Sequence, residues 1–311
     1  MRHLGIAALA VVLLIVGLIV SLVETTANQP WGQTLLDNFL LARSLPFTLG
    51  LGVALGYARA NWPRPAIERR QGAVRRFDAS TIWLHWIATL AVLLGLATGA
   101  WQYLKGLLDI TSPIAMPLVY RVHYIAASVL MFVIALTITD WWLRGSGGLG
   151  VPKGGWVRTL RGLAHELPRP LGGTIAYLLG LDLRRAAPPT EKFTWYERTV
   201  SYPTWVIAIG LIALTGILKA MRYIYPIPGD VLYWVSAIHV GAMVLLAIKV
   251  LDHLRYVLAP SRWPLMVAMA TGWVSARYAA ARHPGWHVTD EPTPDSESAA
   301  APVRPVGGRP A

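Results

Sequence analysis

Six long apolar segments dominate this sequence and restrict what it can fold into. They cover residues 4–23, 39–58, 80–103, 118–143, 200–221 and 231–257. About 20 residues of α-helix, at ~1.5 Å per residue, cross the ~30 Å hydrocarbon layer of a membrane. Apolar residues make up 55% of the chain and charged residues only 14%, whereas a soluble domain carries about a quarter charged residues. The sequence therefore predicts an all-α membrane protein.

The first two segments form a predicted N-terminal transmembrane extension, residues 1–60. Arg43 and Pro46 interrupt the second segment and make it the weakest of the six. The first segment also resembles a secretory signal, because Arg2 precedes it and small residues follow it. Its apolar stretch is longer than that of a typical signal, which favours an uncleaved anchor.

Lysine and arginine are distributed unevenly between the two sides of these segments. With the N-terminus inside, 22 of the 28 Lys and Arg lie in cytoplasmic segments or at the adjoining span ends, and four lie in exterior segments or at the span ends next to them. Cytoplasmic loops of membrane proteins carry such an excess of positive residues. We therefore predict a multi-pass protein of the bacterial inner membrane with both termini in the cytoplasm. The net charge of +12 reflects this topology and contact with anionic lipid, and it does not call for nucleic acid.

The rest of the chain divides into three further predicted regions. Residues 61–260 hold a four-helix core with a long cytoplasmic loop, 144–198. Within that loop, apolar residues recur at helical spacing over 155–167 with charged residues between them, which predicts an interfacial helix. Residues 261–288 are predicted to be a cytoplasmic amphipathic segment. The Pro- and Ser-rich residues 289–311 are predicted to be a disordered tail.

Four histidines lie inside the predicted spans: His85, His123, His239 and His253. Ionisable groups are costly inside a membrane, so these side chains are candidates for function. The chain has no cysteine, which excludes thiolate ligation of an iron–sulfur cluster and covalent attachment of a c-type haem. A redox metal in this chain would therefore have His or Met ligands, as a b-type haem does.

The spacing of these histidines predicts two haem sites at different depths. His239 and His253 are 14 residues apart on one helix, nearly four turns, so both rings leave the same face ~21 Å apart. The third and fourth segments run in opposite directions, which places His85 near the cytoplasm and His123 near the exterior. We therefore predict two b-type haems, an inner one held by His85 and His253 and an outer one held by His123 and His239. With both axial positions filled, each iron would transfer electrons and not bind oxygen.

Two glycines in the third segment are consistent with this arrangement. Gly95 and Gly99 follow His85 by 10 and 14 residues and lie near its helical face, with Gly99 at the depth of the outer haem. A missing side chain there would let a porphyrin approach the backbone. Close packing of membrane helices explains these glycines equally well.

Charged and polar residues near the histidines are candidates for binding the haem propionates and a quinone. Arg76 and Lys249 are the inner propionate candidates, and Arg121, Lys219 and Arg222 are the outer ones. A polar cluster at the inner membrane boundary could form a quinone pocket, because quinone reduction consumes protons. Its members are Tyr196, Glu197, Arg198 and Asp252. Each of these residues also fits the alternative of an ordinary charged group at a helix end.

The region from about Arg76 to Trp286 resembles the dihaem cytochrome b subunits of membrane-bound oxidoreductases. Arg76-Phe77 followed by Leu84-His85-Trp86 is similar to the first ligand helix of that family, and the pair His239 and His253 to its last helix. Residues 192–198 are similar to the approach to its fourth core helix. The ending His283-Pro284-Gly285-Trp286 is similar to that of the formate dehydrogenase gamma subunit. Thr194 and Glu197 stand where that family usually has Asn and Gln.

This resemblance implies a membrane-anchoring dihaem cytochrome b subunit of a formate dehydrogenase-like respiratory complex; the nickel–iron hydrogenase and thiosulfate reductase cytochromes are related. The implied partners are an iron–sulfur subunit and a catalytic subunit of the molybdopterin or nickel–iron type. Electrons would pass from the outer haem to the inner haem and then to menaquinone or ubiquinone. The chain would not oxidise the primary substrate itself. Two alternatives remain open: a stand-alone cytochrome b561-like quinol oxidase, and a haem-free membrane transporter or scaffold.

Overall fold

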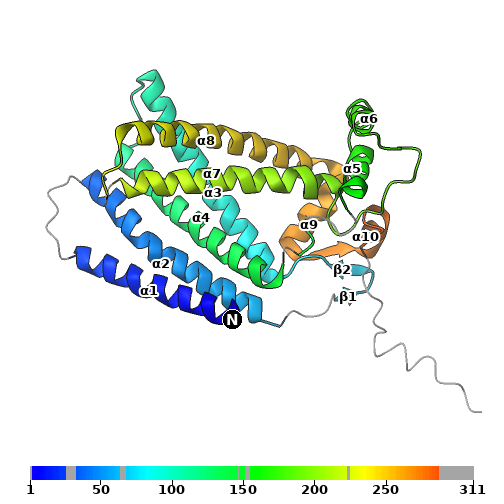
Figure 1. Cartoon of the computed structure of the whole chain (residues 1–311), viewed down its shortest axis with the longest axis horizontal. Coiled ribbons are helices and arrows are strands. Elements are labelled where there is room, and N and C mark those ends of the chain that lie inside the picture. The colour runs from blue at the N-terminus through cyan, green and yellow to red at the C-terminus, as the bar shows by residue number, and fades with distance from the viewer. Residues whose placement is uncertain are drawn as a thin grey trace, which may run out of the picture.

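The computed structural model describes residues 2–25, 33–63, 68–145, 147–150, 155–222 and 225–286, and nearly all of its regular structure is helical (Figure 1). The long helices are α1 (Arg2–Thr25), α2 (Gln33–Asn61), α3 (Ala79–Leu108), α4 (Met116–Arg144), α7 (Tyr202–Met221) and α8 (Gly229–Leu258). Shorter helices are α5 (Gly155–Glu166), α6 (Arg169–Leu178), α9 (Trp263–Thr271) and α10 (Ala276–Arg282). A π-helical turn, Glu197–Ser201, leads into α7, and a 3₁₀ turn, Pro260–Arg262, precedes α9. The strands are β1 (Arg69–Arg70), β2 (Ala73–Arg75) and β3 (Trp273–Ser275).

Five helices in the described part of the chain are long and apolar enough to cross a membrane. They cover His3–Val20, Ala79–Leu108, Met116–Arg144, Glu197–Met221 and Gly229–Leu258. The all-α membrane fold predicted from the sequence is therefore confirmed. The α2 helix forms where the second segment was predicted, with Pro46 inside it, but it does not reach the same apolar character. The predicted tail 289–311 lies outside the described residues.

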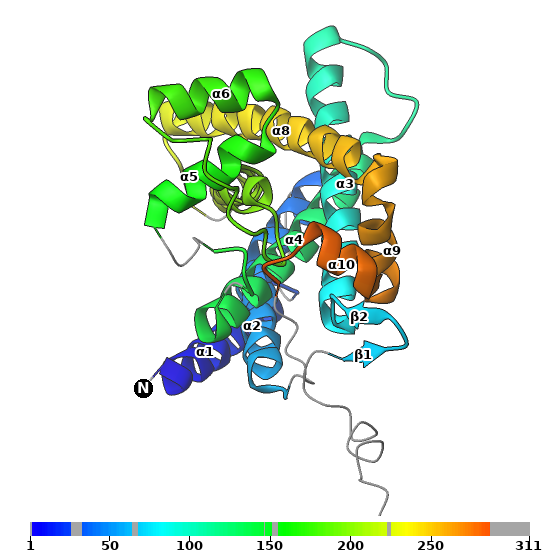
Figure 2. The same cartoon turned by 90° about the vertical axis from the view of Figure 1, so that its right-hand side faces the viewer.

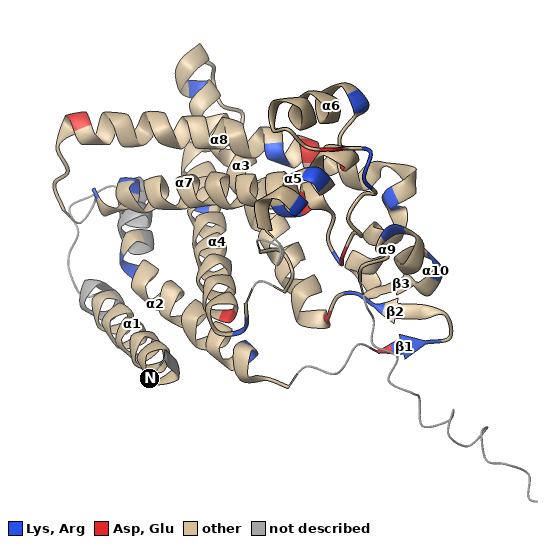
Figure 3. Ribbon diagram, turned by 45° about the vertical axis from the view of Figure 1, so that its right-hand side comes forward, with Lys and Arg blue, Asp and Glu red and all other residues tan. Residues whose placement is uncertain are grey.

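The long helices form one bundle whose two ends differ. The α3–α4 and α7–α8 pairs pack together, and α2 lies along α4 with α1 outside it (Figure 1). One end of the bundle carries the N-terminus, the small sheet, α5, α6, α9 and α10; we call it the loop-rich end. Lys and Arg gather at this end, and few charges lie along the long helices (Figure 3). This segregation agrees with the charge asymmetry that predicts the loop-rich end to be cytoplasmic.

Two glycines bring α2 into backbone contact with α4. A Cβ at Gly52 would lie 2.6 Å from the carbonyl oxygen of Phe132, and one at Gly56 would lie 2.5 Å from that of Leu136. No side chain fits in that space, so the Gly52-x-x-x-Gly56 spacing is required for this close approach. The N-terminal extension is therefore packed directly on the core helices.

A buried ion-pair cluster holds α2 in place at the loop-rich end. Asp140 of α4 is 2% exposed and accepts a 2.8 Å hydrogen bond from Nη1 of Arg59, near the end of α2. Arg144 also donates to this carboxylate, 2.6 Å from its Nε. The guanidinium of Arg59 donates further to Ser80 and Thr81 in the first turn of α3. One arginine thus joins α2, α3 and α4.

A three-stranded sheet lies at the N-terminal end of α3. The sequence did not predict it. Strands β1 and β2 form a hairpin whose turn, Gln71 and Gly72, has positive φ at both residues. Strand β3 pairs antiparallel with β2, with Val274 opposite Val74. The segment predicted to be amphipathic thus divides into α9, β3 and α10, because Gly272 (φ +87°) ends α9 and turns the chain towards β2.

The long loop folds into a helical hairpin across the loop-rich end. The predicted helix over 155–167 is present as α5, and α6 follows it without having been predicted. Figure 2 shows both lying across the long axis of the bundle. The ring of Trp195, 2% exposed, packs against Gly162, where a Cβ would lie 2.4 Å from its Cδ2. The α5 helix is thereby fixed at the level where α7 begins.

Candidate functional site

The structure brings His85 of α3 and His253 of α8 together near the loop-rich end. Their ring centroids lie 6.3 Å apart with an interplanar angle of 50°. Two imidazole nitrogens bound at about 2 Å on opposite sides of one metal place their ring centroids roughly 6 Å apart. The Nδ1 of His85 is buried without a hydrogen-bond partner among the described residues, and Trp205 stands edge-to-face to His253 at 6.0 Å.

The ring of His123, in the first part of α4, is held against α3. Its Nδ1 lies 3.1 Å from the carbonyl oxygen of Gly95 and 3.0 Å from Oγ1 of Thr98. A carbonyl only accepts, so Nδ1 carries the hydrogen and donates. In the neutral ring Nε2 then keeps a free lone pair, as a metal ligand must. A Cβ at Gly99 would lie only 3.2 Å from Cε1 of this ring.

The ring of His239, in the first part of α8, is held in the same way against α7. Its Nδ1 lies 2.8 Å from Oγ1 of Thr215. The hydroxyl of Thr215 has one hydrogen, which it donates to the carbonyl of Leu211 at 2.5 Å. The imidazole must therefore donate from Nδ1, and in the neutral ring Nε2 is again free. A Cβ at Gly216 would lie 3.5 Å from Cε1 of His239.

The two outer histidines occupy one neighbourhood at the end of the bundle opposite the loop-rich end. The missing Cβ of Gly99 would lie 3.2 Å from the His123 ring and 3.9 Å from Sδ of Met243, one helical turn after His239. Two neutral imidazoles with free Nε2 atoms are the donor set of a bis-histidine haem. Among the described residues no group of three or more His, Asp or Glu side chains could hold a metal ion.

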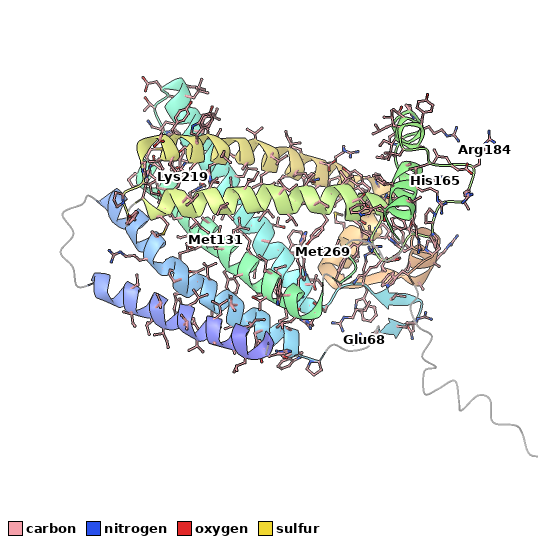
Figure 4. All side chains as sticks on the ribbon, viewed as in Figure 1. Glu68, Met131, His165, Arg184, Lys219 and Met269 are labelled. Carbon is pink, nitrogen blue, oxygen red and sulfur yellow. The ribbon has the colours of Figure 1, made fainter. Side chains whose placement is uncertain are left out.

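The predicted propionate contacts lie in different surroundings. Arg121 is exposed on α4, and Lys219 is half-buried at the end of α7 far from His165 (Figure 4). Arg76 is 3% exposed between the rings of Phe77, Phe193 and Trp286. It donates to the backbone carbonyl of Lys192. Arg76 thus joins the base of α3 to the segment before α7 and to the C-terminal segment.

His283 lies beside Arg76 and was not predicted as a site residue. It is 1% exposed, and its Nδ1 donates to the carbonyl of Glu191 at 2.7 Å. Burial, and then the positive charge of Arg76, lower the pKa of His283 to about 4. The ring is therefore neutral near pH 7, and the hydrogen bond pins the C-terminal segment to the chain entering α7.

Three of the predicted polar residues meet beside the inner pair. Lys249 is 6% exposed, and its Nζ lies 3.0 Å from Oδ2 of Asp252 and 3.4 Å from Oγ of Ser201. The hydroxyl of Tyr196 donates to the same carboxylate oxygen at 3.2 Å. Burial, and then Asp252, raise the pKa of Tyr196. Ser201 belongs to the π-helical turn, a distortion that often marks functional sites.

The other two predicted quinone residues have structural partners. Glu197 accepts a 2.7 Å hydrogen bond from the backbone N–H of Thr194, whose hydroxyl accepts one from the backbone N–H of Glu197. This reciprocal pair is a capping box, which explains the residue types found where the related subunits have Asn and Gln. Arg198 is buried and pairs with Glu191 at 2.8 Å, away from Asp252.

Sequence reasoning singled out Gly95 and Gly99 but missed Thr98, Thr215 and Gly216, which also contact the rings of His123 and His239. Thr98-Gly99 and Thr215-Gly216 are the same dipeptide, and their threonines precede the contacted histidines by 25 and 24 residues. The repetition is visible in the sequence, although threonine and glycine are too common in membrane helices to attract attention alone. The α3–α4 and α7–α8 pairs thus hold their histidine rings through the same dipeptide at the end of the bundle opposite the loop-rich end.

Comparison with known protein families identifies the bundle. A family model described as prokaryotic cytochrome b561 matches residues 76–272, more than half of the chain. The chain belongs to the prokaryotic cytochrome b561 family. This family binds b-type haem, so the chain is a multi-pass membrane cytochrome b with an electron-transfer role, and a haem-free transporter or scaffold is set aside. No curated protein matches the chain.

The family match also limits what the resemblance supports. It begins at Arg76 and ends at Gly272, so α1, α2 and the ending around His283 lie outside it. The likeness to the formate dehydrogenase gamma subunit rests on that ending and stays a prediction.

Proposed function

We propose that this cytochrome b561 family member is the membrane-anchoring dihaem subunit of a formate dehydrogenase-like respiratory complex. It would carry electrons between an iron–sulfur subunit and the quinone pool. The observation that carries the proposal is that α8 bears a histidine near each end: the ring centroid of His253 lies 6.3 Å from that of His85 on α3, and His239 lies against Gly216 of α7. Two redox centres at two depths allow a charge to cross a membrane; a single centre does not.

The chain's own residues would prepare both sites for b-type haem. Bound haem would supply one-electron chemistry, and His85 with His253, and His123 with His239, would hold it. Hydrogen bonds at Nδ1 of His123 and His239 keep their Nε2 atoms free for iron. The half-buried Lys219, one turn after Thr215, is a candidate contact for the outer propionates.

The quinone would bind at the loop-rich end, beside the inner pair. Asp252 there is hydrogen-bonded to Tyr196 and Lys249. A carboxylate held between a hydroxyl and an ammonium can take part in the proton uptake that reduction of menaquinone or ubiquinone requires. We expect Asp252→Asn to slow quinone reduction while both haems remain. Asp230→Asn, in the exposed first turn at the opposite end of α8, is the matched control.

The proposed partners follow from the resemblance and from the predicted topology. The loop-rich end would face the cytoplasm, and the outer haem would receive electrons from an iron–sulfur subunit on the exterior face. A catalytic subunit of the molybdopterin or nickel–iron type would oxidise the substrate. Both subunits would remain attached in a native membrane extract.

Purification of the tagged chain in a mild detergent tests the proposal. We expect an iron–sulfur protein and a larger catalytic subunit to co-purify in equal amounts. Reduction of the haems by the primary substrate should then depend on those subunits. A chain that purifies alone, and whose haems are reduced by quinol, would instead support a stand-alone cytochrome b561-like quinol oxidase.

A further inference from the structure

The outer histidines are held by a repeated element whose parts have matching roles. In each half of the core, a Thr-Gly pair on one helix faces a histidine on the next. The threonine oxygen receives the Nδ1 hydrogen, and the glycine lies beside the Cε1 edge of the ring. We propose that Thr98-Gly99 and Thr215-Gly216 fix the tautomer of the outer ligands and lower the reduction potential of the outer haem. This inference rests on the proposed function, because it assumes haem at the outer level.

Neither threonine is free to donate to the imidazole. Oγ1 of Thr98 donates to the carbonyl of Leu94 at 2.6 Å, and Oγ1 of Thr215 donates to that of Leu211 at 2.5 Å. Each hydroxyl has one hydrogen and donates it to a carbonyl of its own helix, so only its oxygen lone pairs face the ring. The bond is therefore Nδ1–H to oxygen in both cases, and the other tautomer would leave two acceptors facing each other.

A hydrogen bond donated from Nδ1 makes the imidazole a stronger electron donor through Nε2. A stronger donor stabilises ferric iron more than ferrous iron, so the reduction potential falls. The inner site differs, because Nδ1 of His85 is buried without a hydrogen-bond partner among the described residues. The threonines therefore act only on the outer haem.

The two threonines should not lower the reduction potential of the outer haem equally. The ring of His123 has a second acceptor, the carbonyl of Gly95 at 3.1 Å, so it keeps a hydrogen bond when Thr98 is replaced. For His239, Thr215 provides the only hydrogen bond to the ring among the described residues. We expect Thr215→Val to have the larger effect, with the shape of the side chain preserved and its hydroxyl removed.

A redox titration of the purified chain, followed at the haem alpha band, tests this inference. The wave that disappears in His123→Ala identifies the outer haem. Thr215→Val should raise the potential of that wave by up to a tenfold change in the reduction equilibrium, about 59 mV for one electron. Thr98→Val should raise it less, and Thr215→Ser should restore it. The ferric low-spin electron-resonance signal of the outer haem should change in parallel.

Thr89→Val is the matched control, because the Thr89 hydroxyl bonds to the backbone carbonyl of His85 at 2.8 Å and contacts no ring nitrogen. It should move neither wave. An unchanged outer wave in a Thr215→Val protein that holds both haems would overturn the inference, as would a shift confined to the inner wave. If Thr215→Val does not retain haem, Thr98→Val provides the same test. A wild-type chain with fewer than two haems would instead overturn the proposed function.

Discussion

Replacement of Asp140 by Asn tests whether α2 is locked to the cytochrome core. Asp140 is 2% exposed and accepts hydrogen bonds from two arginines, Arg59 and Arg144. The change keeps the size of the side chain but leaves two guanidinium groups without their counter-charge. Breaking a buried pair in this way costs roughly 3–5 kcal/mol. For a chain of this size that loss lowers the midpoint of thermal unfolding by roughly 10 °C.

The measurement is the melting of the detergent-solubilised protein, followed by fluorescence-detected size exclusion. Asp182→Asn is the control, because Asp182 pairs with Arg185 at 3.5 Å on the surface, where such a pair contributes less than about 1 kcal/mol. The double variant Asp140→Asn with Arg59→Gln should lower the melting temperature by less than the sum of the two single decreases, since both changes break the same interaction. Equal melting temperatures of the Asp140→Asn and Asp182→Asn variants would refute the reasoning.

Two further predictions concern the loop-rich end. Gly162→Ala should displace Trp195, because Cδ2 of that ring would lie 2.4 Å from the new Cβ. The change should therefore speed tryptic cleavage within α5. Gly173→Ala on α6 is the control: nothing lies within 4 Å of the added Cβ, so the cleavage rate should stay unchanged. His283 has a folded pKa of about 4 against an ordinary value of 6.5. Its contribution to stability is therefore complete above pH 6.5 and falls as the pH drops from 6.5 to 4, by roughly 3 kcal/mol at most. His283→Asn should flatten that part of the pH–melting profile, and an unchanged profile would contradict the placement of His283.

The long apolar segments and the four histidines were readable from the sequence because each depends on local periodicity. Helix pitch alone predicts that His239 and His253 share one face of α8, and charge asymmetry alone predicts the orientation of the spans. The α5 helix was likewise predicted from its apolar spacing, and its bounds agree within one residue.

The parts that could not be predicted depend on contacts between distant residues. The β2–β3 pairing joins residues 73–75 to residues 273–275, and the short strands carry no signal of their own. The clamp between Arg59 and Asp140 joins α2 to α4 across 81 residues. The capping role of Glu197 depends on a helix that begins directly after Thr194, and the residue spacing alone does not show that helix start.

The central claim is that the histidines form two haem sites, one pair at each end of α8. Haem content and the reduced-minus-oxidised spectrum of four single His→Ala variants test it most directly. The wild-type chain should hold two b-type haems; His123→Ala and His239→Ala should lose the same one, and His85→Ala and His253→Ala the other. Loss of one common haem in His85→Ala and His123→Ala, or a wild-type spectrum of a single haem, would contradict the account.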